Sequence, residues 1–203
     1  MQKILVTGAN GQLGSELREL SNFVNRYKWI FTDRQELELS DLQNIADNIT
    51  TISPDIIINC AAYTAVDKAE EEFELADVIN HQAVAIIAKW TFANNCKFIH
   101  VSTDYVFDGT SSIALNEDVP TSPINVYGKT KLSGEHVCRN ENPESIIIRT
   151  SWVYSSYGVN FVKTMSRLMK EKDTLNVVND QIGSPTYASD LAQAILNVLK
   201  HSN

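Results

Sequence analysis

The sequence predicts a Rossmann-like α/β fold, in which helices cover both faces of a doubly wound parallel sheet, with part of a smaller C-terminal domain after it. Short apolar runs of strand length alternate with amphipathic segments of helix length, an alternation typical of βαβ units. Continuous apolar runs such as residues 56–58 are expected of strands buried on both faces. A glycine-rich turn directly follows the first apolar run, where such folds begin their first helix.

The predicted strands are apolar runs at residues 4–7, 29–32, 56–60, 98–102 and 146–150. The candidate helices between them lie at residues 13–21, 41–51, 81–94 and 125–139. Because a strand, a helix and a parallel strand are joined by a right-handed crossover in nearly all proteins, this alternation predicts one parallel sheet.

The pattern loosens after residue 150. A polar turn at 155–158 precedes a predicted helix at 160–172 and a short apolar piece at 175–178. A final amphipathic helix is predicted at 189–199, with Ser189 as its N-cap.

Composition excludes several classes of partner. The chain has 203 residues and a formal net charge of -8, which argues against nucleic acid or an anionic membrane surface as the main partner. No window approaches the roughly 20 apolar residues that a membrane span needs, and no signal-peptide pattern is present, so we expect a cytoplasmic protein. The cysteines and the four histidines show no disulfide or metal-ligand spacing, and we expect them to be structural.

Residues 7–14 read Thr-Gly-Ala-Asn-Gly-Gln-Leu-Gly. Gly8, Gly11 and Gly14 permit a tight turn, a close approach to a pyrophosphate and packing of the helix on the sheet. The backbone N–H groups near Gln12 and Leu13 then face the phosphates at the helix N-terminus. The loop predicts a dinucleotide cofactor, and the alternative is a glycine-rich turn without a ligand.

An acidic residue follows the second predicted strand. Asp33 lies about 20 residues beyond the loop, where a carboxylate accepts hydrogen bonds from the adenosine ribose of NAD. The neighbouring Arg34 is suited to the additional phosphate of NADP. The pair leaves NADH and NADPH open as cofactors, and an exposed turn pair is the alternative.

Tyr127 and Lys131 are four residues apart in a predicted helix, so both side chains leave the same face. An ammonium beside a phenol favours the phenolate and lowers the phenol pKa. The spacing therefore predicts a proton-transfer pair, and two solvated surface residues are the alternative.

Five longer motifs carry a resemblance to a known family. They read NCAAYTAVDKAE, STDYVFDG, PINVYGKTK, RTSWVY and NDQIGSPT, at residues 59–70, 102–109, 123–131, 149–154 and 179–186. With them the chain resembles the extended short-chain dehydrogenase/reductase family, and within it the dTDP-4-dehydrorhamnose reductases. The resemblance implies reduction of the 4-keto group of dTDP-4-dehydro-L-rhamnose by NADH or NADPH, the last step of dTDP-L-rhamnose synthesis.

The resemblance assigns Thr103, Tyr127 and Lys131 to the catalytic triad. Tyr127 is expected to donate a proton to the ketone oxygen, Thr103 to orient that oxygen, and Lys131 to hold the nicotinamide ribose. We expect the Lys131 ammonium, together with the positively charged nicotinamide of the oxidised cofactor, to bring the pKa of Tyr127 from about 10 to near 7, a change of roughly 4 kcal/mol.

The resemblance also implies further binding residues. Those expected along the cofactor are Glu38, Leu39, Ala61, Ala62, Tyr63, Thr64 and Val101. Glu38 stands where the family usually has Asp. Asp104 and Trp152, together with Thr103, are expected to line the sugar site, and a core position is the alternative for Trp152.

We predict a dinucleotide-binding Rossmann domain over residues 1–150, which carries the triad, and a partial substrate-binding region with returning helices over residues 151–203. Family members continue past the last predicted helix, so we expect the C-terminal part of the substrate domain to be missing. Members are often dimeric and sometimes depend on magnesium, so the resemblance raises a homodimer and Mg²⁺ as expectations. The sequence offers no compact carboxylate cluster as a metal site.

Two other functions share the cofactor-binding core. One is a sugar-nucleotide 4,6-dehydratase or epimerase. Dehydratases that resemble this chain place an acidic residue directly after the Thr-Asp pair, where this chain has Tyr105. A non-catalytic subunit similar to the regulatory subunit of methionine adenosyltransferase has no need of Thr103, Tyr127 and Lys131 together.

Overall fold

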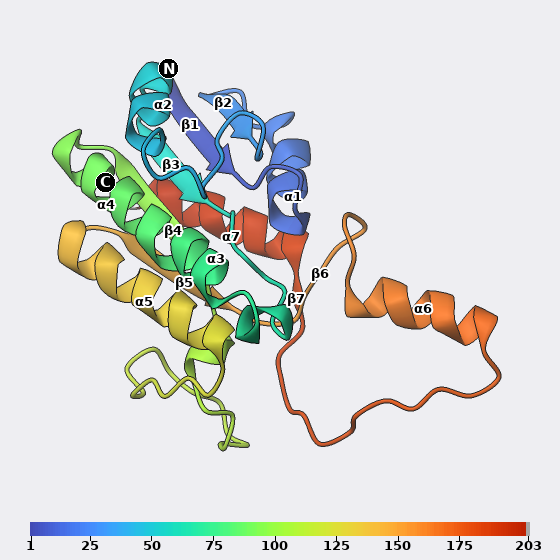
Figure 1. Cartoon of the computed structure of the whole chain (residues 1–203). Coiled ribbons are helices and arrows are strands. Elements are labelled where there is room, and N and C mark those ends of the chain that lie inside the picture. The colour runs from blue at the N-terminus through green and yellow to red at the C-terminus, as the bar shows by residue number, and fades with distance from the viewer. Residues whose placement is uncertain (202–203) are drawn as a thin grey trace.

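A five-stranded parallel sheet forms the centre of the fold in the computed structural model of the chain, which describes residues 1–201. The strands are β1 (Gln2–Thr7), β2 (Tyr27–Thr32), β3 (Ile56–Asn59), β4 (Lys97–Thr103) and β5 (Ile146–Thr150). Their order is β2-β1-β3-β4-β5, and every neighbouring pair is parallel (Figure 1). The order switches direction between β1 and β3, as expected of a doubly wound sheet.

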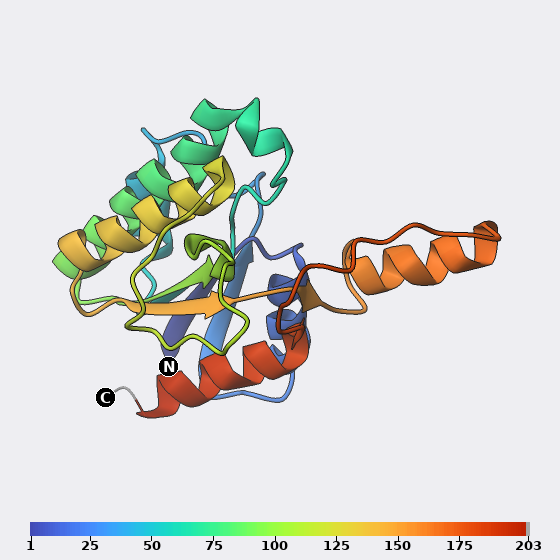
Figure 2. The same ribbon diagram turned by 90° about the horizontal axis from the view of Figure 1, so that it is seen from below.

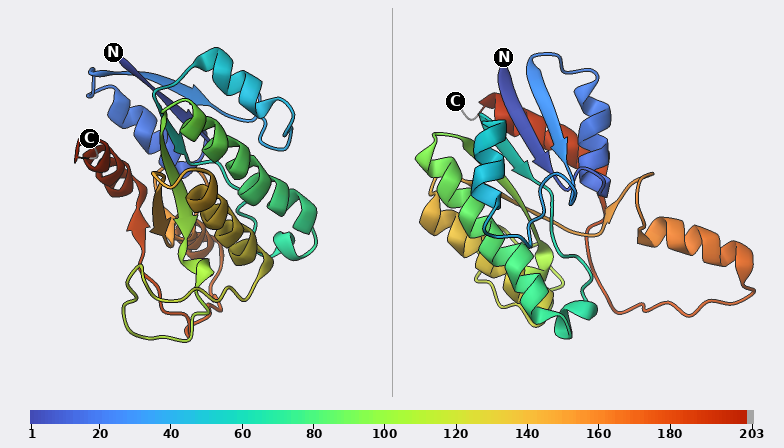
Figure 3. Two further views of the ribbon diagram at one scale, coloured as in Figure 1. Left: turned by 90° about the vertical axis from the view of Figure 1, so that its left-hand side faces the viewer. Right: turned by 45° about the horizontal axis from the view of Figure 1, so that its top comes forward.

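Helices cover both faces of the sheet (Figure 3). One face carries α1 (Gln12–Ser21) and α7 (Ala188–His201), and the other carries α2 (Ile45–Ile52), α4 (Ala83–Ala93) and α5 (Val126–Glu141). The predicted Rossmann-like fold class is confirmed.

Alternate side chains of the strands enter two separate cores, because successive side chains of a strand point to opposite faces. On β1, Ile4 and Val6 pack towards α1 and α7, whereas Leu5 packs towards α2 and α4. On β3, Ile57 joins the core of Leu5, and Ile58 joins that of Ile4. All five side chains are completely buried, which explains why these strands read as continuous apolar runs.

Two predicted helix starts are wrong. The helix expected from residue 41 begins at Ile45, because Asn44 N donates to the Asp41 carbonyl (3.1 Å) in a preceding turn. The helix expected from residue 81 is instead reached through α3 (Phe73–Asp77) and a π-helical turn, η2 (Val78–Gln82), that runs into α4.

One prediction near the C-terminal end is also wrong. Ser189 does not cap the last helix, because α7 already begins at Ala188. The apolar piece at 175–178 lies in a segment without helix or strand. The structure pairs β6 (Val153–Tyr154) with β7 (Thr186–Tyr187) in a two-stranded parallel sheet that the sequence did not predict.

Helix α6 (Phe161–Glu171) lies between β6 and β7 and projects away from the sheet (Figures 1 and 2). None of its residues is buried. The chain then returns, and α7 packs against α1. No helix within residues 1–201 is long and apolar enough to cross a membrane.

Candidate active site

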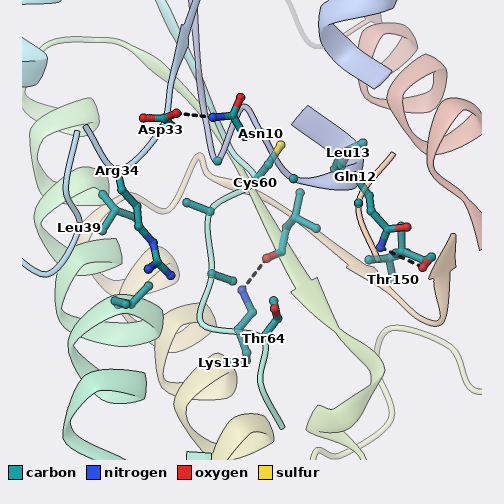
Figure 4. Close-up of a pocket in the computed structure, with 18 of the residues that line it drawn as sticks. Asn10, Gln12, Leu13, Asp33, Arg34, Leu39, Cys60, Thr64, Lys131 and Thr150 are labelled. Atoms are coloured by element: carbon teal, nitrogen blue, oxygen red, sulfur yellow. Dashed lines mark hydrogen bonds between the residues drawn. The ribbon is translucent and has the colours of Figure 1, made fainter. Parts of the chain in front are cut away.

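A cavity of about 640 Å³ lies at the carboxyl ends of the central strands (Figure 4). Doubly wound sheets bind their ligands at this edge, next to the point where the strand order reverses. The sequence-predicted residues that line it are Gly8, Gly11, Gln12, Leu13, Asp33, Arg34, Glu38, Leu39, Ala61, Ala62, Thr64, Val101, Tyr127 and Lys131. The cavity thus gathers side chains and backbone from the whole Rossmann sheet.

The glycine loop adopts the tight path that its sequence suggests. Gly8 has a φ of +65°, and a Cβ atom there would lie 2.7 Å from the Ala61 nitrogen. A Cβ atom on Gly14 would lie 2.4 Å from the Gly8 carbonyl oxygen. Glycine at these positions lets α1 begin directly against the loop, with its N-terminal N–H groups at the cavity.

Asp33 lies at the end of β2 and faces Asn10 of the glycine loop (Figure 4). The Asp33 carboxylate accepts hydrogen bonds from Gln35 N (2.8 Å) and from the Asn10 side chain. The Gln35 N–H is the largest of the influences that lower the pKa of Asp33. Asp33 is therefore ionised and fixed in place, with Arg34 beside it on the cavity wall.

Tyr127 lies in the first turn of α5, next to Thr103 at the end of β4. Asn125 caps this helix, because its side-chain oxygen accepts from Gly128 N (2.7 Å). A side-chain hydrogen bond with Thr103 acts on the Tyr127 phenol, and the Tyr105 ring packs edge-on against the Tyr127 ring at 5.5 Å. The phenol is thus held at a fixed point on the cavity wall.

Lys131 is expected to lower the pKa of Tyr127. This expectation is wrong where only the side chains and backbone of the chain act on the phenol. Burial raises the pKa of Tyr127 to about 12, and the Thr103 hydrogen bond opposes this only in part. The Lys131 amine instead donates to the Val101 carbonyl oxygen (2.7 Å), and burial lowers the pKa of Lys131 to about 8. Tyr127 is consequently protonated at neutral pH, which is the form that a proton donor requires.

Gly128 permits the contact between α5 and the end of β4. A Cβ atom on Gly128 would lie 2.2 Å from the Tyr105 carbonyl oxygen in the 3₁₀ turn η3 (Asp104–Val106). This close approach brings the first turn of α5 against the residues that follow Thr103.

Gly128→Ala will push the first turn of α5 away from the Tyr105 carbonyl and misplace Tyr127. We expect kcat of the reaction in which Tyr127 acts to fall about tenfold or more, since small displacements of reacting groups are costly. Steady-state kinetics with a thermal melt will measure it. Lys129→Ala, at the exposed neighbouring position, is the control, and equal rates for both variants contradict the assigned contact.

Five predicted site residues are not on the cavity wall, and the fifth, Thr103, is described in the next paragraph. Gly14 supports the loop from behind, as described above. Tyr63 is buried in the core and its hydroxyl donates to Glu72 (2.5 Å). Asp104 accepts from the Thr103 hydroxyl (3.2 Å) beyond the cavity, and Trp152 is 45% exposed with its ring against Gly183. Trp152 is therefore not a core residue.

Thr103 itself is buried, and its neighbour Ser102 lines the cavity in its place. Its hydroxyl also accepts from Tyr105 N (3.2 Å). The structure thus brings Thr103 to Tyr127 without exposing it broadly to the cavity.

Several wall residues were missed from the sequence. Cys60 and Thr150 end or follow predicted strands, so the common edge of parallel strands is a signal that could have found them. Val153 and Gly158 carry no such signal. They reach the cavity because Gln12 donates to the Val153 carbonyl oxygen (3.2 Å) across 141 positions of sequence.

Residues 1–201 contain no group of three or more His, Cys, Asp or Glu side chains that could hold a metal ion. The expectation of magnesium therefore finds no support in this structure.

The family described as RmlD substrate binding domain matches residues 1–203. The dTDP-4-dehydrorhamnose reductase of Aggregatibacter actinomycetemcomitans is 44% identical over 198 residues, which are 98% of this chain and 67% of that protein. The chain thus spans about two thirds of the length of this relative.

Solved structures of proteins with the same name as this relative are similar in fold to this chain. A dTDP-4-dehydrorhamnose reductase of Clostridium acetobutylicum has a TM-score of 0.95 and 42% identity, covering 99% of this chain and 71% of that one. The Bacillus anthracis enzyme of the same name, in complex with NADP, has a TM-score of 0.94 with the same identity and coverage. The chain therefore belongs to the RmlD substrate binding domain family, whose similar members include dTDP-4-dehydrorhamnose reductases.

Proposed function

We propose that the chain binds a reduced nicotinamide dinucleotide in the cavity and reduces the 4-keto group of dTDP-4-dehydro-L-rhamnose to give dTDP-L-rhamnose. The observation that carries this proposal is the position of Tyr127, a protonated phenol on the cavity wall with Thr103 beside it and Lys131 one helical turn further. The relatives named dTDP-4-dehydrorhamnose reductase support the choice of substrate.

The placement of the residues supports a role for each of them. When bound, the cofactor supplies the hydride for the ketone carbon. Tyr127 donates its Oη proton to the ketone oxygen, so that a carbinol forms. Thr103 orients the phenol and the oxygen, and the Lys131 amine, which lines the cavity, holds the nicotinamide ribose. The glycine loop and the start of α1 hold the pyrophosphate.

We propose NADPH as the preferred cofactor. The relative from Bacillus anthracis was solved with NADP. In this chain the Asp33 carboxylate is already engaged by Asn10 and Gln35, and Arg34 lines the cavity next to it. A guanidinium at this place suits the additional phosphate of NADPH.

Arg34→Ala will weaken NADPH binding by about tenfold and leave NADH binding almost unchanged, because only NADPH carries the phosphate. Cofactor titration by fluorescence gives both dissociation constants. Arg167→Ala, on the projecting helix α6, is the control. Equal losses for NADPH and NADH contradict this role of Arg34.

The tyrosine after the Thr-Asp pair argues against a dehydratase, because Tyr105 supplies no carboxylate there and packs on Tyr127 instead.

A homodimer stays a prediction that light scattering on the purified chain will test. We propose the cytoplasm as the site of the reaction, and the nucleotide-sugar substrate and the reduced cofactor support this proposal.

The proposed function is tested by adding the ketosugar to the chain with NADPH and following cofactor oxidation. We expect oxidation that depends on the ketosugar, with dTDP-L-rhamnose as the product. NADPH that binds but is not oxidised in the presence of ketosugar contradicts the proposal.

A further inference from the structure

A row of buried polar side chains joins Lys131 to the first strand. Its members come from β1, β3 and β4, and each is at most 2% exposed: Thr7, Asn59 and His100. They stand in register across the sheet, since Thr7 pairs with Asn59 and Asn59 with His100. Lys131 lies at the end of this polar row, with its Nζ 3.4 Å from His100 Nε2.

The hydrogen bonds of the polar row have a direction. The Thr7 hydroxyl donates to Asn59 Oδ1 (2.6 Å). This turns Asn59 Nδ2 towards His100 Nδ1, at 3.1 Å, so Nδ1 accepts. Burial, followed by the nearby Lys131 charge, lowers the pKa of His100 well below its ordinary value, and the ring is neutral.

A neutral imidazole carries one N–H group. With His100 Nδ1 accepting from Asn59, that N–H lies on Nε2 and faces Lys131. An N–H group facing an ammonium places donor against donor, whereas the same N–H donates well to an uncharged amine. The hydrogen-bond direction that the Thr7 hydroxyl sets therefore disfavours the charged form of Lys131.

We propose that His100 is a positioning residue for Lys131, and that Thr7, acting through Asn59, decides whether the His100 nitrogen that faces the Lys131 amine carries the ring hydrogen or a lone pair, and so how readily that amine carries its charge. The role of Lys131 at the cofactor rests on the proposed function, but the coupling along the polar row does not. Thr7 also accepts from Ala61 N (3.3 Å) on the cavity wall, so the row connects the amine to the loop that follows β3.

Other groups also act on Lys131. Burial is the main cause of its lowered pKa, and Cys138 and Glu135 from α5 and Cys60 after β3 oppose it. These groups stay the same when Thr7 is changed. If substitution of Thr7 changes the pKa of Lys131, the change will therefore come from the direction of the hydrogen bonds along the polar row.

The test is Thr7→Val, which keeps the shape of the side chain and removes the hydroxyl. Without that donor, the Asn59 amide can turn over and accept from His100 Nδ1–H, which leaves the Nε2 lone pair for the Lys131 ammonium. We expect the pKa of Lys131 to rise by about half a unit or more. Carbon NMR of labelled lysine in the purified chain measures it, with Lys131→Met to assign the signal.

Two further variants complete the test. His100→Phe keeps a ring and removes both nitrogens, so Thr7→Val should add no further shift in that background. Thr91→Val removes a comparable buried hydroxyl, which accepts from Asn142 Nδ2 (2.9 Å) away from Lys131. We expect it to leave the Lys131 titration unchanged.

A Lys131 titration that is unaffected by Thr7→Val overturns the proposal, as does a shift that persists without the His100 ring. If circular dichroism shows that His100→Phe does not fold, the comparison of Thr7→Val with Thr91→Val decides alone. The titration needs neither ketosugar nor cofactor, so a failure of the proposed function is seen separately, as absent turnover in the wild-type chain.

Discussion

Tyr127→Phe will lower kcat for ketosugar reduction by about 10²- to 10⁴-fold, the range expected for loss of a general acid. The variant keeps the ring on the cavity wall and removes only the hydroxyl that donates the proton. We expect the dissociation constant of NADPH to change by less than about twofold, because Phe preserves the contact surface. Stopped-flow kinetics and cofactor titration measure the two quantities separately.

Tyr105→Phe is the matched control. The Tyr105 ring packs on Tyr127 at 5.5 Å, but no role in proton transfer is assigned to its hydroxyl, so its kcat should stay near that of the wild type. If Tyr127→Phe turns over as fast as Tyr105→Phe, Tyr127 is not the acid.

Arg149→Met will lower the free energy of unfolding by about 3 kcal/mol, because it leaves a buried carboxylate without its partner. Arg149 makes two hydrogen bonds to Glu135, at 2.9 Å and 2.7 Å, and the Glu135 side chain is only 1% exposed. Ser102, on the cavity wall, donates to the same carboxylate (2.6 Å). Urea unfolding followed by circular dichroism will measure the loss.

The stabilisation that Arg149 gives to Glu135 changes with pH in a definite direction. Burial raises the pKa of Glu135, but hydrogen bonds from Arg149 and Ser102 outweigh it and hold the pKa below its ordinary 4.5. The stabilisation is therefore present above the ordinary pKa and is lost as pH falls through the lowered one. We expect the difference between Arg149→Met and the wild type to shrink in acid.

Arg167→Met is the control for an exposed ion pair. Its partner Glu171 lies 2.7 Å away, but both side chains are at least half exposed. Its loss should cost about 0.5 kcal/mol or less. Equal losses for the two arginine variants would show that the Glu135 site is not buried in solution.

The sheet could be predicted from the sequence because each strand contains a short apolar run, and the structure confirms all five. The start of α4 could not, since α3 and a π-helical turn continue it backwards into an acidic segment. The turn before Ile45 could not be predicted either, because Asp41 and Asn44 fit a helix as well as a turn.

The glycine loop and the Tyr127 pair were also predictable, because each function imposes a fixed local spacing. The Tyr127 pKa was not, because spacing along a helix does not say which way the Lys131 amine turns. It turns to the Val101 carbonyl on β4, and this partner depends on the sheet. Asn10 opposite Asp33, and Val153 above Gln12, likewise depend on contacts between distant segments.

Hydride and proton are expected to reach the ketone at the cavity wall beside Tyr127. The most direct measurement is a single turnover with excess protein and NADPH that carries deuterium on the transferred position, with the sugar nucleotide analysed by mass spectrometry. We expect one deuterium at C4 of the reduced sugar with the wild-type chain and a rate at least about 10²-fold lower with Tyr127→Phe. Unlabelled ketosugar recovered from wild-type protein saturated with NADPH contradicts the account.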